Sequence, residues 1–119
     1  MKKMLWTKFI SGCFLFCLLH ALVWFSTNLQ FVKGFENSRT LLYAMCLAVP
    51  TTLIAYFATK LTYSSLEDSL WAVRFVGFGT SYLVFPVLTW AFLGESMFTA
   101  KTLVCVFLSL LIVFIQVFY

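Results

Sequence analysis

The chain has 119 residues, of which 63% are hydrophobic and only 10% are charged, and its mean hydropathy is +1.01. This composition excludes an ordinary water-soluble domain and predicts a protein of the lipid bilayer. The net charge of +4 comes from eight Lys and Arg residues against four acids, scattered between apolar segments, so nucleic acid is not an expected partner.

Four apolar segments are long enough to cross a bilayer core of about 30 Å, for which a helix needs roughly 20 residues. They cover residues 5–27, 41–59, 70–93 and 102–119. None shows the alternation of a β-barrel strand, and in lipid the backbone hydrogen bonds must then be made within each helix. The sequence therefore predicts an all-α fold, a four-helix transmembrane bundle. We expect a single domain over residues 1–119, with no extramembrane domain and no cleaved signal peptide.

The first segment carries polar and aromatic side chains on one helical face. Cys13, Cys17, His20 and Trp24 stand at i, i+4, i+7 and i+11. Two thiols and an imidazole resemble part of a soft-metal site, but a set of four ligands is incomplete. We therefore predict no metal and no cofactor, and we interpret the cysteines as part of a helix contact. His20 and Trp24 are candidate substrate contacts.

The third segment contains Arg74 about one turn inside its start. A buried arginine costs at least ~2.5 kcal/mol at the bilayer centre, although less near the interface, so this side chain needs a partner. One hypothesis is that Arg74 contacts a substrate. The alternative is that Arg74 reaches toward the lipid headgroups and pairs with Glu67 or Asp68 in the preceding loop.

Aromatic residues share the helical face of Arg74. Trp71, Phe78 and Tyr82 stand at i−3, i+4 and i+8 from the arginine. A guanidinium among aromatic rings is suited to an anion or to a planar group that stacks on it. Trp71 and Tyr82 are therefore candidate substrate contacts together with Arg74.

The fourth segment has a polar stripe in an otherwise aliphatic helix, formed by Lys101, Cys105, Ser109 and Gln116. Cys105 and Ser109 make a small-xxx-small step, and Gln116 offers a hydrogen bond between helices. We predict that Cys105, Ser109 and Gln116 form an oligomer interface, either with a second copy of the chain or within a larger membrane complex.

Basic residues near the helix ends give a weak orientation signal. Those expected on the side of the amino terminus are Lys2, Lys3, Lys8 and Lys60, and those expected opposite are Lys33, Arg39 and Lys101. This bias predicts an inner or plasma membrane protein with both termini in the cytoplasm. Because the difference is small, insertion in both orientations and an antiparallel homodimer stay open.

The end of the chain resembles a known family. The run TWAFLGE at residues 89–95, followed by an apolar last helix, resembles the end of a repeat in the drug/metabolite transporter superfamily. The size and the four spans are similar to its smallest branch, the small multidrug resistance proteins, whose G-x-G step in the third helix corresponds to Gly77-Phe78-Gly79. The resemblance covers about Trp71 to Phe118 and implies a homodimeric membrane transporter.

The chain also departs from that branch. The small multidrug exporters depend on a glutamate in the middle of helix one, whereas residues 5–27 contain no acid, so their proton-coupled cation export is not expected here. The usual glycine of the dimerising fourth helix is missing, and Ser109 is the nearest small residue. In these respects the chain looks more like other short four-helix members of the superfamily that also lack the acid.

Together these features predict a small integral membrane transporter that moves a small solute through a cavity lined by the first three helices. Its candidate substrate contacts are Arg74, Trp71, Tyr82, His20 and Trp24. An arginine in place of an acid favours an anionic or neutral solute. The alternative function is a non-transporting membrane subunit or accessory protein that binds a larger complex. An enzyme is not expected, because no catalytic triad, metalloprotease motif, phosphate-binding loop or paired intramembrane carboxylates occur in the sequence.

Overall fold

The chain folds into four long helices and one short 3-10 helix. The computed structural model describes residues 6–35 and 39–118. Its elements, in chain order, are α1 (Trp6–Asn28), η1 (Leu29–Phe31), α2 (Thr40–Ser65), α3 (Leu70–Leu93) and α4 (Ala100–Phe118). These two stretches contain no strand, which confirms the prediction of an all-α fold.

All four long helices are long and apolar enough to cross a membrane. The shortest, α4, has 19 residues and therefore rises about 28 Å, close to the thickness of a bilayer core. The chain is accordingly a multi-pass membrane protein. Lys2 and Lys3, which contribute to the predicted orientation, lie outside the described residues, as do the predicted first and last residues of the outer spans, Leu5 and Tyr119.

Helix α2 continues six residues beyond the predicted end of the second span at Thr59. The sequence from Lys60 to Ser65 is polar and was expected to be part of a connection. Its hydroxyl groups are accommodated in the helix because they bond to backbone carbonyls of the preceding turn: Thr62 Oγ1 donates to Ala58 O at 2.7 Å, and Ser65 Oγ donates to Thr62 O at 2.9 Å. Thr62 and Ser65 are almost fully buried, so this polar end of α2 faces the interior.

A four-residue turn joins α2 to α3. Two of its residues, Glu67 and Asp68, have left-handed backbone conformations with φ of 58° and 57°. Ser69 then caps α3, because its Oγ accepts a hydrogen bond from the backbone N–H of Ala72 at 3.2 Å. The buried side chain of Leu66 holds the turn against the protein. This short turn reverses the direction of the chain between α2 and α3.

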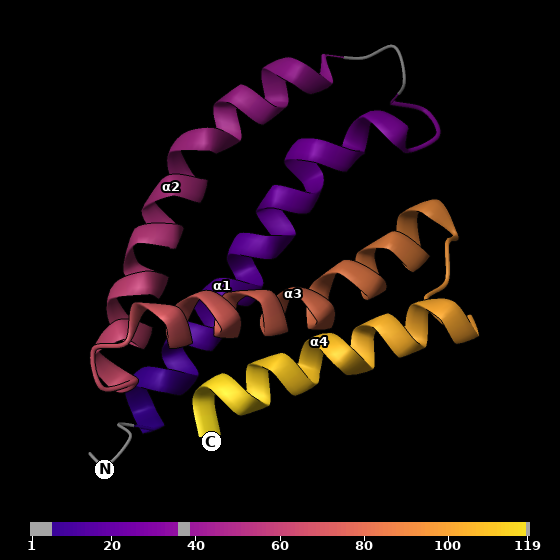
Figure 1. The fold of residues 1–119 in the computed structure, drawn as a ribbon. Coiled ribbons are helices and arrows are strands. Elements are labelled where there is room, and N and C mark those ends of the chain that lie inside the picture. Colours follow the sequence, from indigo (N-terminus) through magenta and orange to yellow (C-terminus); the bar gives the residue numbers. More distant parts are fainter. Residues whose placement is uncertain (1–5, 36–38, 119) are drawn as a thin grey trace.

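The molecule is flat, and its main helix contacts are α2 with α1, α1 with α3 and α3 with α4, with a smaller contact between α2 and α3. Figure 1 shows two antiparallel pairs, α1 with α2 and α3 with α4, with α3 crossing α1. The molecule measures 52 × 37 × 19 Å, and its smallest dimension is less than two helix diameters of about 10–12 Å. One face of each helix is therefore available to lipid or to another protein.

The interior is correspondingly small. Its buried apolar residues are Phe16, Ala58, Leu66, Ala72, Val73 and Val76. Gly12 allows α1 to approach α2 closely, because a Cβ there would collide with the Thr62 side chain and lie 3.2 Å from its backbone nitrogen. The accessible surface of 8347 Å² exceeds the roughly 6,600 Å² expected for a compact soluble protein of 13.7 kDa. The excess is mostly apolar surface, which lipid can cover.

Candidate functional site

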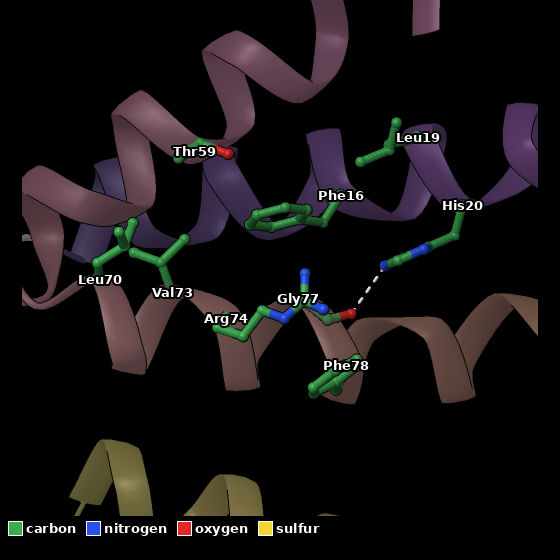
Figure 2. Close-up of a pocket in the computed structure, with 9 residues that line it drawn as sticks. All are labelled: Phe16, Leu19, His20, Thr59, Leu70, Val73, Arg74, Gly77 and Phe78. Carbon is green, nitrogen blue, oxygen red and sulfur yellow. Dashed lines mark hydrogen bonds between the residues drawn. The ribbon is translucent and has the colours of Figure 1, made fainter. Parts of the chain in front are cut away.

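A cavity of about 400 Å³ lies between α1, α2 and α3. This volume is within the range of small-molecule sites in proteins. The residues that line it, shown in Figure 2, are Phe16, Leu19, His20, Thr59, Leu70, Val73, Arg74, Gly77 and Phe78. Helical periodicity explains this set, because the lining residues of α1 and those of α3 recur at steps of three or four and therefore share one face of each helix.

His20 joins α1 to α3 at one end of the cavity. Its Nε2 lies 2.8 Å from the carbonyl oxygen of Gly77 and 3.1 Å from Thr80 Oγ1. Because a carbonyl can only accept, Nε2 carries the hydrogen and donates it. In the neutral ring Nδ1 is then an acceptor, and nothing in the described part of the chain bonds to it. His20 thus combines a structural bond with one free acceptor.

Arg74 lies at the other end of the cavity, on the first turns of α3. Its Cζ atom is 4.8 Å from the centre of the Phe78 ring, which is a cation–π contact. The expected alternative, an ion pair with Glu67 or Asp68, is not formed, and within residues 6–35 and 39–118 no oxygen accepts a hydrogen bond from the guanidinium. In Figure 2 the side chain extends from α3 toward Phe16. The charge therefore faces the cavity without a partner from the described chain.

Thr59 provides the third polar group of the cavity, from α2. Its hydroxyl has no hydrogen-bond partner among the residues that the structure describes. The sequence analysis did not identify Thr59 as a cavity residue, because the predicted second span ends at this position. It also missed Phe16 and Leu19, although Phe16 is four residues from His20 and Leu19 is three residues from Phe16, spacings that indicate a shared helical face. The site is a largely apolar cavity with a cation, an imidazole and a hydroxyl.

Of the five predicted substrate contacts, the structure brings His20 and Arg74 into this cavity and places the others elsewhere. Trp24 is only 2% exposed, and its Nε1 donates to Thr89 Oγ1 at 3.0 Å, so it joins α1 to α3 away from the cavity. Tyr82 donates from its hydroxyl to Ser109 Oγ at 3.2 Å and lies between α3 and α4. Trp71 is 70% exposed and lies on the outer side of Arg74, where both line a shallow hollow with Leu70.

The three residues of α4 that are predicted to form an oligomer interface do not share one environment. Ser109 accepts from Tyr82 and donates to the carbonyl of Cys105 at 2.9 Å, so it belongs to the contact between α3 and α4 of the same chain. Cys105 and Gln116 are exposed. All four cysteines are free, and no group of three or more metal-binding side chains occurs in the described residues. Cys13 instead packs against the apolar core.

Comparison with known proteins gives no further guide. No protein-family model, no curated protein and no solved structure matches this chain. Function therefore has to be inferred from the cavity and from the surfaces around it.

Proposed function

We propose that this chain is a small membrane transporter of the drug/metabolite type, which acts as a homodimer and moves a small solute through the cavity between α1, α2 and α3. The observation that carries the proposal is an arginine without an acidic partner that shares a cavity with His20 inside the predicted membrane spans. An intramembrane ionisable residue that faces a cavity is a functional candidate because its burial is costly. Both termini are expected in the cytoplasm.

The position of the cavity suits a carrier. Arg74 is four residues and Gly77 seven residues after the start of α3. His20 is fourteen residues into the 23-residue α1, and it bonds to Gly77 where α3 crosses α1. The lining residues thus reach the middle part of α1, and the binding sites of secondary transporters lie near the middle of their spans.

The open side of the cavity supports the homodimer. The cavity is only partly enclosed by α1, α2 and α3, and the Arg74 side chain is exposed in the single chain. A second copy packed on the same face would close the cavity and shelter the guanidinium from lipid. An antiparallel arrangement of the two copies is compatible with the weak charge bias.

The transport proposal is tested by reconstituting the purified full-length chain in liposomes and recording solute-driven currents or uptake for a panel of small anions and neutral solutes. We expect Arg74→Gln to reduce the flux of the transported solute at least tenfold. Lys101→Gln, which removes an exposed charge from α4 outside the cavity, should leave the flux unchanged. Flux that both variants support equally would remove Arg74 from the site.

A second candidate function is a non-transporting subunit of a larger membrane complex. The exposure of α4 favours it, because this helix has no fully buried residue and presents Cys105 and Gln116 outward. A defined stoichiometric complex with an unrelated membrane protein, together with no flux in liposomes, would favour this function over transport.

A further inference from the structure

The unpaired guanidinium of Arg74 indicates the chemistry of the solute. The Arg74 Cζ atom lies over the Phe78 ring, 4.8 Å from its centre, and this contact occupies none of the N–H donors with an oxygen acceptor. Those donors have no acceptor in the described part of the chain. A planar fork of free donors matches the two oxygens of a carboxylate, which it binds with two parallel hydrogen bonds.

The rest of the cavity indicates the body of the solute. Its walls are mainly apolar, with the aromatic rings of Phe16 and Phe78 on α1 and α3. Such walls favour a flat or branched hydrocarbon group and disfavour a sugar or a polyanion, whose polar groups would find too few partners. The Thr59 hydroxyl, which has no partner in the described part of the chain, can donate a hydrogen bond to an oxygen of the solute.

We propose that the solute is a small monocarboxylate with an apolar body, held by its carboxylate on Arg74 and by its body against Phe16 and the apolar residues beside it in the cavity. This inference rests on the proposed transport function and names the substrate class of the same cavity. The carboxylate supplies the negative charge that the first helix of this chain does not contain. Binding thus offsets the cost of an arginine inside the membrane span.

An anionic lipid headgroup offers the same oxyanion chemistry. Arg74 also lines the outer hollow with Leu70 and Trp71, which a headgroup could reach from the bilayer. The inner cavity continues to His20 and Thr59, and this favours a soluble carboxylate over a lipid. Binding measured in membranes with and without anionic lipid distinguishes the two sources.

The test uses three solutes of nearly the same shape and different charge: benzoate, benzamide and benzamidine. The full-length chain is placed in nanodiscs of neutral phosphatidylcholine, and binding is measured by isothermal titration calorimetry. We expect benzoate to bind at least about tenfold more tightly than the neutral and cationic compounds, since charge-assisted hydrogen bonds to the guanidinium are worth that ratio or more. Arg74→Gln should weaken benzoate binding by the same factor, Arg74→Lys by less, and Lys101→Gln not at all.

Three results would overturn the inference: no benzoate binding, equal binding of the three compounds, or benzoate binding that Arg74→Gln leaves intact in a folded, monodisperse protein. Displacement of benzoate by phosphatidylglycerol in the nanodisc, dependent on Arg74, would assign the site to a lipid headgroup. The experiments also distinguish a failure of the transport proposal from a failure of the substrate assignment. Benzoate binding that depends on Arg74 without benzoate flux in liposomes removes the carrier function and keeps the site, whereas Arg74-independent flux of neutral solutes keeps the carrier and removes the carboxylate.

Discussion

At the scale of single residues, several polar side chains of the described spans bond to the backbone or across a helix contact. His20, Trp24 and Tyr82 each make a bond from one helix to another. Arg74 differs from them because its charge is not matched within the described chain. In a membrane a polar group with a partner stabilises the fold, and a charged group without one is a candidate for ligand binding.

The His20 bond predicts a modest loss of stability when it is removed. His20→Phe deletes the N–H donor to the Gly77 carbonyl but keeps a flat ring, and it should lower the free energy of unfolding by about 0.6 to 1.7 kcal/mol, the range measured for bonds between membrane helices. His20→Gln, whose amide nitrogen can reach the same carbonyl, should recover most of the loss. Unfolding in mixed micelles measures both variants, and equal stability of His20→Phe and the original chain would contradict the bond.

The turn between α2 and α3 predicts stabilising substitutions. Glu67 and Asp68 have left-handed backbones that cost a side-chain residue roughly 1 kcal/mol and cost glycine nothing. Glu67→Gly should therefore raise the free energy of unfolding or leave it unchanged. Ser64→Gly, one turn earlier within α2, should lower it by up to about 1 kcal/mol, because there glycine weakens a helix. A loss of stability in Glu67→Gly as large as in Ser64→Gly would contradict the strained turn.

At the scale of helices, long apolar segments are enough to predict their number and approximate extent. The end of α2 was not predictable in this way, because Thr62 and Ser65 have the composition of a loop and are buried by their contact with α1. The helical periodicity of α1 and α3 predicted which residues share a face with His20 and with Arg74. It could not show which helix each face meets, since the pairing of Trp24 with Thr89 depends on the crossing of whole helices. The second helix was predicted to line the cavity, but its contributing residue, Thr59, was not identified, for the same reason.

The close contact of α1 with α2 predicts unequal effects for two glycines. Gly12→Ala places a methyl group against Thr62 and its backbone nitrogen, and it should destabilise the fold by about 1–3 kcal/mol. Gly77→Ala meets only Phe16, at an ordinary distance of 3.7 Å, and should be better tolerated. Thermal unfolding in detergent compares them. If Gly77→Ala were the more harmful, the observed approach of α1 and α2 would be incorrect.

At the scale of the whole molecule, the protein is a thin layer whose surface is too large and too apolar for a closed monomer in water. Lipid can cover most of that surface, but the cavity stays partly open in the single chain. A second copy on the face of the cavity would close it. The outward side of α4, with Cys105 and Gln116, is a separate candidate interface, because α4 packs against α3 and contributes no residue to the lining of the cavity.

The homodimer predicts selective crosslinking. In a chain that keeps Cys105 as its single cysteine, oxidation in native membranes should give a disulfide-linked dimer if α4 meets α4 of a second copy inserted in the same orientation. In an antiparallel pair the two Cys105 residues, five residues after the start of the 19-residue helix, would lie too far apart to bond. A chain that keeps only Cys46, which is also exposed but lies on α2, serves as the control and should remain largely monomeric. Equal crosslinking of the two variants would indicate random collision and would contradict an interface on α4.

The proposal as a whole requires that the cavity beside Arg74 contains water. This is measured in a chain whose native cysteines are replaced, by labelling single cysteines in liposomes with a charged methanethiosulfonate reagent that reacts with thiolates in water. Leu19→Cys lines the cavity and should be labelled rapidly, with protection by bound solute. Leu83→Cys lies on an exposed apolar face of α3, outside the cavity, and should react slowly because lipid covers it. Labelling of Leu19→Cys no faster than that of Leu83→Cys would mean that the helices enclose no wet site, and would contradict transport through it.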